Sequence, residues 1–205
     1  MAFLTGGIST RRYILMEPPP PQLEKTATLA IRRYSWRAID DSRGERESFG
    51  WVNPRRILDP MFTWDDVLIS PYVLLGVRRD RKAFSPVIFR ARRDEKLGIV
   101  KKEKKIEKIS RQHRIAIEEE LTVEMLKETS PQSAFSELVW DLNSNLVYIG
   151  ATGNAACERI QEIFEATFDV KIRPMFPALT AAEYIAVQGL EEEFQLANAA
   201  AQEVE

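Results

Sequence analysis

Lysine and arginine are concentrated in one stretch of this chain. From Arg78 to Arg114 there are 15 basic residues against 5 acidic ones, a local charge of +10. The other 168 residues hold 14 basic and 26 acidic residues, so the formal net charge is only −2. This separation suggests a surface segment that binds a polyanion, carried by an acidic body. The alternative is a solvated helix with many intrahelical ion pairs.

Composition limits the class of protein. The chain has 205 residues and is 44% hydrophobic, enough to bury a core in one large domain or two small lobes. Cys157 stands alone, which excludes a disulfide framework and a thiol-based metal cluster and fits a reducing cytosol. The start, 1–7, lacks a basic leader region, and the apolar run 13–16 is too short to span a membrane. We expect a cytoplasmic protein that does not bind membranes.

Hydrophobic period and turn residues predict alternating strands and helices. The expected elements are a strand over 13–16, a helix over 22–34, a loop over 40–47, a strand over 48–52, an irregular segment over 54–66, a strand over 67–77 that Pro71 breaks or places at an edge, a hairpin of strands over 134–142 and 146–151, a helix over 153–166 and a strand over 170–173. Thr180 and Glu183 form a capping-box pattern before a further helix, and 191–205 reads as an acidic, frayed tail.

The basic stretch itself reads as helical. Ser85 suits an N-cap and Pro86 a first helical position, which predicts a helix from Pro86 to about Ile109 with a weak point at Gly98. A second helix over 110–128 buries part of one face, formed by Ile115, Leu121, Val123 and Leu126. The class is therefore α+β with mostly antiparallel pairing. The expected units are 1–84, 85–130, 131–190 and the tail 191–205, with one continuous domain as the alternative.

The main functional candidate is the basic helical segment. Positions 101, 104, 105 and 108 share one helical face, so their lysines would form a rail of charges that neutralises phosphates with little sequence preference. Glu103 and Glu107 are too few to neutralise this excess. The expected DNA-binding residues are Arg79, Arg90, Arg92, Arg93, Lys96, Lys101, Lys102, Lys104, Lys105, Lys108, Arg111 and Arg114.

Evidence for catalysis is weak. Four aspartates near strand ends, Asp65, Asp66, Asp80 and Asp141, could in principle meet in a two-metal nuclease site, but they form no known motif. The lone His113 favours a surface role or a phosphate contact, Cys157 favours the core, and all four tryptophans favour packing over base stacking. No phosphate loop or dinucleotide fingerprint is present. We expect no catalytic residue, no metal site and no cofactor.

Several motifs, in order along the chain, resemble the RdgC family of recombination-associated proteins. The run 49–54, Phe-Gly-Trp-Val-Asn-Pro, is similar to that family's Gly-Trp-Val-Pro-Pro. Further similar segments are the strand and charged turn over 73–82, Ser-Pro-Val-Ile at 85–88, the lysine run 101–105, Ala-Phe-Ser at 134–136, Val-Trp-Asp at 139–141 and Thr-Ala-Ala-Glu-Tyr at 180–184. The resemblance spans about residues 10–188.

The resemblance implies a bacterial, nucleoid-associated protein that binds duplex DNA without sequence preference and restrains RecA-promoted recombination. Members dimerise into a ring whose hole is basic, so the basic helix would face DNA. This chain stops sooner than typical members, which leaves an open dimer or another oligomer as alternatives. Gln132 also stands where the family has a basic residue.

Two other hypotheses remain open at the level of sequence. One is the metal-dependent nuclease, which the four aspartates would serve. The other is a protein-interaction module, in which the basic helix meets an acidic partner or the chain's own acidic tail. Removing Lys101, Lys102, Lys104 and Lys105 together should weaken DNA binding without unfolding the chain, and deleting the tail should raise affinity if the tail competes.

Overall fold

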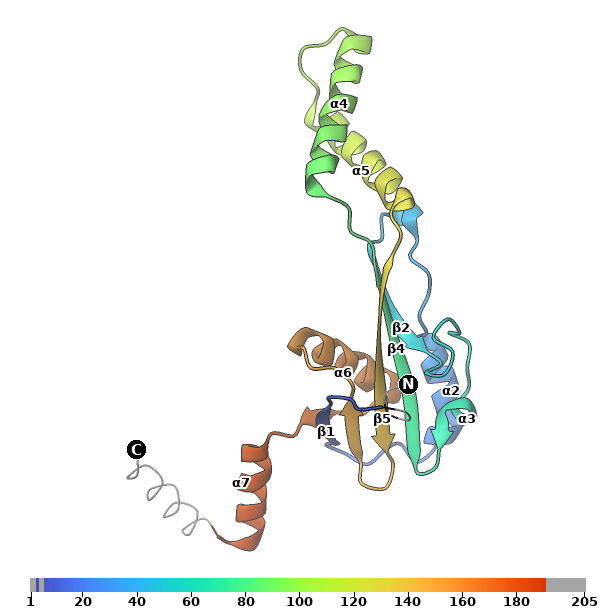
Figure 1. Cartoon of the computed structure of the whole chain (residues 1–205), viewed down its shortest axis with the longest axis vertical. Coiled ribbons are helices and arrows are strands. Elements are labelled where there is room, and N and C mark those ends of the chain that lie inside the picture. Colours follow the sequence, from blue (N-terminus) through green and yellow to red (C-terminus); the bar gives the residue numbers. More distant parts are fainter. Residues whose placement is uncertain (1–2, 4–5, 191–205) are drawn as a thin grey trace, which may run out of the picture.

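The chain forms one antiparallel sheet from which a long helical arm projects (Figure 1). This computed structural model describes residues 3 and 6–190. Its described part contains a seven-stranded sheet in the order β2-β4-β5-β6-β1-β7, with β3 paired to β4. The strands are β1 (Arg11–Leu15), β2 (Glu47–Val52), β3 (Leu68–Ile69), β4 (Tyr72–Arg81), β5 (Gln132–Asp141), β6 (Leu146–Ile149) and β7 (Ile172–Pro174). The expected α+β class is confirmed.

The core lies between one face of the sheet and the helices α2 (Leu23–Arg33), α3 (Trp64–Val67) and α6 (Asn154–Phe168). Alternation along β4 sends Val73, Leu75 and Val77 to this face. Trp140 of β5 meets two rings of α6, with centroids 5.2 Å from Phe164 and 5.4 Å from Phe168. The body is therefore organised around an aromatic cluster.

The tryptophans and the single cysteine serve this packing. Trp51 and Trp140 are fully buried, Trp64 nearly so, and Cys157 is 1% exposed. Half-buried Trp36 lies under the guanidinium of Arg78, whose Cζ is 4.0 Å from the ring centroid. The preference for packing over base stacking is thus confirmed for the three buried indoles.

The strands β4 and β5 are the longest of the sheet and lead into the arm. Their register runs from Tyr72 opposite Asp141 to Arg81 opposite Gln132. Beyond this ribbon, α4 (Pro86–Lys104) and α5 (Arg111–Glu128) pack against each other as a helical hairpin (Figure 1). No residue of α4 is buried, whereas α5 buries four, which are Ile117, Leu121, Met125 and Leu126. Leu121 and Leu126 were expected there, but Ile115 is 44% exposed.

Two predicted helix boundaries were wrong. The helix α4 ends at Lys104, not near Ile109, because Lys105 turns to φ 51° and Ile106 N–H donates to Lys101 O at 3.1 Å, closing the helix. The C-terminal helix α7 (Pro177–Gln188) begins after Phe176, so Thr180 is not its cap.

The predicted strand over 67–77 is also divided. Its start belongs to α3 and β3, and the chain turns at Pro71 into β4, which extends to Arg81. The capping box of Thr63 and Asp66 that starts α3 was not predicted. The tail 191–205 lies outside the described residues, so its predicted state stays a prediction. Within the described chain, no helix has the length and apolar character needed to cross a bilayer.

Candidate nucleic-acid interface

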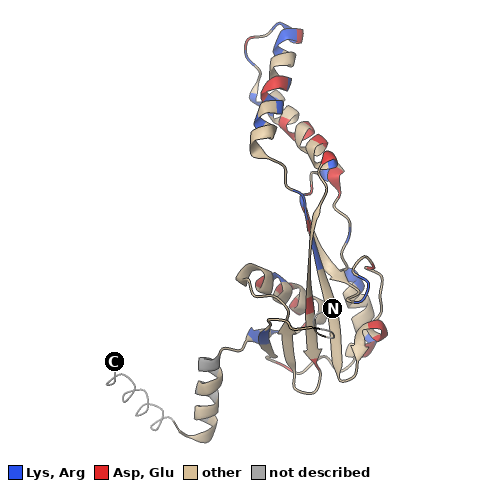
Figure 2. Ribbon diagram, in the orientation of Figure 1, with Lys and Arg blue, Asp and Glu red and all other residues tan. Residues whose placement is uncertain are grey.

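The far end of the arm carries the densest positive charge of the molecule (Figure 2). Residues 101–114, here called the tip, contain seven basic residues and two acidic ones. All nine of these side chains are exposed. No ion pair joins the basic ones to a carboxylate within the described chain; the recorded contact is Lys104 Nζ at 3.2 Å from His113 Nε2. The tip therefore presents unneutralised cations, which are Lys101, Lys102, Lys104, Lys105, Lys108, Arg111 and Arg114.

The helix dipoles distinguish two explanations for this charge, which are stabilisation of the helices and binding of an anionic ligand. Cations in the last turn of α4 complement the negative end of the helix dipole, so Lys101, Lys102 and Lys104 stabilise α4. Arg111 and Arg114 instead lie in the first turn of α5, which holds no acidic residue and whose dipole disfavours cations. Helix stability does not explain this second pair. An anionic ligand at the tip would.

Nearer the body, the cations of α4 are neutralised. We call Arg92, Arg93 and Lys96 the root. Arg92 pairs with Glu128 of α5 at 2.7 Å and Lys96 with Glu124 at 2.5 Å, while Arg93 lies 2.9 Å from Asp94 and 3.6 Å from Glu118. These bonds raise the pKa of Arg92 and lower that of Glu124. Three of the DNA-binding residues expected from the sequence are thus paired with carboxylates. Among the cations of α4 that precede the tip, only exposed Arg90 lacks such a pair in the described chain.

The lysine rail expected at positions 101, 104, 105 and 108 does not form on one helix. Because α4 stops at Lys104, Lys105 and Lys108 lie in the connection between the helices, and the four lysines at 101, 104, 105 and 108 do not share one helical face. They are brought together by the turn instead. The positive surface is a cluster at the end of a hairpin.

Arg79 lies away from the arm surface, on the core face of the sheet. It donates to Glu47 at 2.7 Å, and Arg159 of α6 binds the same carboxylate. Burial alone raises the pKa of Glu47, but the hydrogen bonds from Arg79 and Arg159 outweigh it and hold the pKa below its ordinary value. The structure therefore gives Arg79 a packing role in the body.

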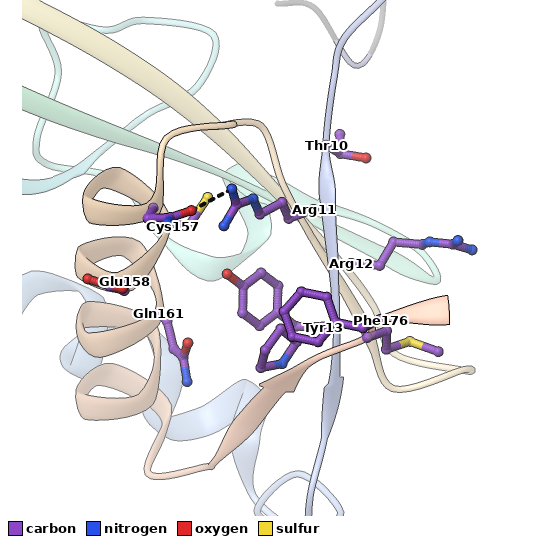
Figure 3. Close-up of a pocket in the computed structure, with 11 residues that line it drawn as sticks. Thr10, Arg11, Arg12, Tyr13, Cys157, Glu158, Gln161 and Phe176 are labelled. Atoms are coloured by element: carbon purple, nitrogen blue, oxygen red, sulfur yellow. Dashed lines mark hydrogen bonds between the residues drawn. The ribbon is translucent and has the colours of Figure 1, made fainter. Parts of the chain in front are cut away.

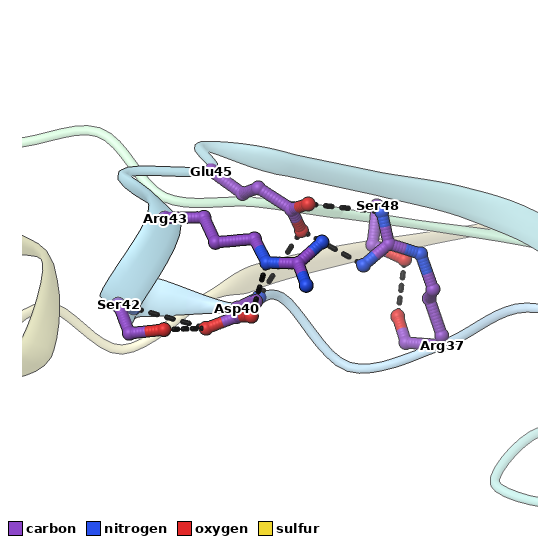
Figure 4. Close-up of polar contacts among 6 residues, drawn as sticks. All are labelled: Arg37, Asp40, Ser42, Arg43, Glu45 and Ser48. Atoms are coloured by element: carbon purple, nitrogen blue, oxygen red, sulfur yellow. Dashed lines mark hydrogen bonds and ion pairs between the residues drawn. The ribbon is translucent and has the colours of Figure 1, made fainter.

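Polar contacts among its own residues hold the loop between α2 and β2 (Figure 4). Arg37 pairs with Glu45 at 2.9 Å, and Arg43 with Asp40 at 3.2 Å. This loop includes the short η1 helix (Asp41–Arg43), which contacts α5.

Buried Lys82 ties these parts together and was missed in the sequence, where it reads as part of a basic turn. Its ammonium donates to both carboxylate oxygens of Asp41 at 2.7 Å and to Leu126 O at 2.9 Å, near the end of α5. The arm is thereby anchored to the body.

A cavity lies elsewhere, between β1, α6 and the segment after β7 (Figure 3). It measures about 680 Å³. Arg11 donates to Asn154 Oδ1 at 2.7 Å, and the Cys157 thiol lies 3.2 Å from Ala151 O. Burial raises the pKa of Tyr13, and the neighbouring thiol raises it further. The Arg11 guanidinium and the Cys157 thiol thus have hydrogen-bond partners within the protein, and these groups form no nucleophile–base pair.

The four aspartates of the nuclease hypothesis do not converge. Asp80 and Asp141 lie toward opposite ends of the β4–β5 ribbon, about 27 Å apart at about 3.4 Å per residue. Asp66 caps α3, and Asp65 is exposed on the same short helix. No group of three or more metal-binding side chains occurs among residues 3 and 6–190.

The fold and the tip define a class: an α+β protein with an exposed cationic arm. A comparison with protein families matches residues 32–201 to the family described as "Putative exonuclease, RdgC". The match covers most of the chain, which therefore belongs to the RdgC family. A search among curated proteins found no match.

Proposed function

We propose that this chain binds duplex DNA through phosphate contacts, without reading its sequence, and modulates RecA-dependent recombination and replication. The observation that carries the proposal is the tip, where seven cations stand without carboxylate partners in the described chain. Membership of the RdgC family supports the assignment to recombination. The protein would act at the nucleoid as a homodimer or higher oligomer, without a cofactor.

The chemistry of the tip fits phosphate better than base edges. Lysine ammoniums are point charges with no fixed hydrogen-bond fork, so they neutralise phosphates but discriminate poorly between bases. Duplex DNA carries about one charge per 1.7 Å of axis, and each neutralised phosphate releases counterions. The first turn of α5 adds backbone N–H groups that suit an anion.

Fluorescence anisotropy of labelled DNA tests the proposal. Two duplexes of unrelated sequence should bind equally, and affinity should fall steeply between low and near-physiological salt. A single strand of equal length shows whether duplex is preferred. Failure to bind any DNA at low salt would exclude this function and leave an acidic protein partner for the tip.

The family description favours a second candidate, an exonuclease. We propose that the chain is not an enzyme, because its candidate carboxylates do not converge and three of the four, Asp66, Asp80 and Asp141, have ordinary structural contacts. Incubating end-labelled duplex with the protein and Mg²⁺ or Mn²⁺ tests this. Cleavage that Asp80→Asn or Asp141→Asn abolishes would support the nuclease instead.

A further inference from the structure

The strand β5 is paired along only part of its length. Its partner β6 covers Leu138–Asp141, while β4 pairs with all of Gln132–Asp141 on the other side. In the described structure, the outer side of residues 132–136 therefore has no neighbouring strand. Residues 132–135 are exposed. This segment, here called the open edge, is about 17 Å long at about 3.4 Å per residue.

The direction of the free backbone groups follows from the ladder. Gly150 N–H donates to Glu137 O at 2.8 Å, so Glu137 directs its peptide groups toward the β6 side. Alternate residues of a strand point their peptide groups to the same side, which places those of Ser133 and Phe135 along the open edge. An added strand would find two N–H donors and two C=O acceptors there.

A cavity of about 340 Å³ adjoins this edge on the core face of the sheet. The small residues Ala134 and Ser136 line it on β5, and exposed Ala155 and Ala156 line it on α6. Val77 and Phe49 also line it. Because the residues beside the edge are small, a side chain from a neighbouring strand could reach over them into the cavity.

The wall of the cavity carries surplus positive charge. Arg79 and Arg159 share the single carboxylate of Glu47, which leaves one net positive charge. The helix α6 also begins beside this wall, and its N-cap residue Gly153 provides no side-chain cap for the first amides. Both features favour a carboxylate beside the cavity.

We propose that the open edge binds an extended acidic segment of a partner protein by strand addition. An aliphatic side chain of the segment, opposite Ala134, fills the cavity, and an acidic residue two positions away faces Arg159. Backbone hydrogen bonds to Ser133 and Phe135 give affinity, and the cavity and charge give specificity.

The same features argue against a second copy of this chain on the edge. A second open edge would present Ala134 and Ser136, which are too short to fill the cavity, and equal positive charge. This inference does not depend on DNA binding, because the tip lies at the other end of the arm (Figure 2).

A designed peptide tests the proposal with the full chain. The probe is Thr-Glu-Thr-Val-Thr-Glu-Thr, which places valine and both glutamates on one face. In ¹⁵N-resolved NMR, it should shift the amides of Ser133 and Phe135 and slow their hydrogen exchange. The peptide with lysine for glutamate should bind at least tenfold more weakly. A peptide N-methylated at the two threonines beside valine should also bind at least tenfold more weakly, because N-methylation removes the backbone N–H groups that would hydrogen-bond to the open edge.

Matched variants locate the cavity. Ala156→Leu should fill it and weaken the peptide at least tenfold, while Ala166→Leu, exposed on the same helix but outside the cavity, should bind like the parent. Unshifted Ser133 and Phe135 amides at millimolar peptide would overturn the proposal. Equal binding of the lysine peptide would overturn its charge preference. Concentration-dependent shifts of these amides without peptide would show a second copy on the edge and overturn the choice of partner.

Discussion

The body and the arm of this molecule are stabilised in different ways. In the body, large side chains such as Trp51, Trp140 and Phe164 are fully buried between sheet and helices. In the arm, α4 buries no residue and is held to α5 through a narrow apolar seam and ion pairs. Burial of large side chains stabilises the body, whereas the helices of the arm bear charged side chains that are solvated. Residues of the arm are therefore available for contacts with a partner.

A second contrast lies within α4 itself. Root and tip have similar residue types, but the root cations face the carboxylates of α5 and the tip cations do not. The count of basic residues alone does not locate a binding surface. The placement of acidic neighbours does.

The largest expected effect is the loss of stability on truncating a buried isoleucine of the body, compared with an exposed isoleucine of the arm. Ile149→Ala in the core should lower the free energy of unfolding by about 2–5 kcal/mol, from lost burial and the resulting cavity. The same change at Ile99 on α4, which is 49% exposed, should have a much smaller effect. Urea denaturation followed by circular dichroism measures both. Equal losses would mean that the arm contributes to the core as much as the sheet does.

The anchor between arm and body should give an intermediate effect. Lys82→Met leaves Asp41 without its buried partner and removes a donor from Leu126 O, which should cost roughly 1–3 kcal/mol. Lys127→Met, exposed nearby, is the matched control. Hydrogen exchange should accelerate mainly in α5 and η1. Acceleration spread evenly over the sheet would contradict a local anchor.

A pH-dependent effect on stability is expected at Asp80, near the end of β4 that leads into the arm. Burial raises the pKa of Asp80, but hydrogen bonds from Arg78 and Ser133 outweigh it and hold the pKa below its ordinary value. A lowered folded pKa stabilises the fold above the unfolded value, about 3.9, and this is lost as pH falls through the folded value. The stability difference between the parent and Asp80→Asn should therefore be largest near neutral pH and shrink below about pH 4. A difference independent of pH would exclude this linkage.

The smallest effect is expected at the root. Arg92→Ala with Lys96→Ala removes two solvent-exposed pairs, and such pairs contribute little to folding. The urea midpoint should stay within experimental scatter. A marked drop would show that ion pairs, rather than the seam of Leu121 and Met125, hold the hairpin together.

Local sequence signals predicted much of the fold. Ser85 with Pro86, and Ser110, were identifiable helix starts, and alternation with Asn143-Ser144-Asn145 gave the β5–β6 hairpin. These features depend on neighbours in sequence. The end of α4 did not follow from such signals, because Lys105 adopts the left-handed conformation that glycine more often supplies.

The binding surface was only partly predictable. The exposed lysines of the tip follow from charge density, but the neutralisation of Arg92 and Lys96 needs carboxylates 36 and 28 positions away. The role of Lys82 needs Asp41 and Leu126 together. The open edge appears only when the lengths of β5 and β6 are compared in register. Each of these depends on tertiary placement, which one-dimensional patterns do not encode.

The salt dependence of duplex affinity, measured for three proteins, tests the central claim most directly. These are the parent, a tip variant with Lys101, Lys102, Lys104 and Lys105 changed to Gln, and a root variant with Arg92 and Lys96 changed to Gln. Each lost phosphate contact should reduce the slope of log affinity against log salt by about 0.9. We predict a weaker and clearly shallower response for the tip variant and an unchanged one for the root variant. Equal slopes for all three proteins would contradict the assignment of DNA binding to the tip.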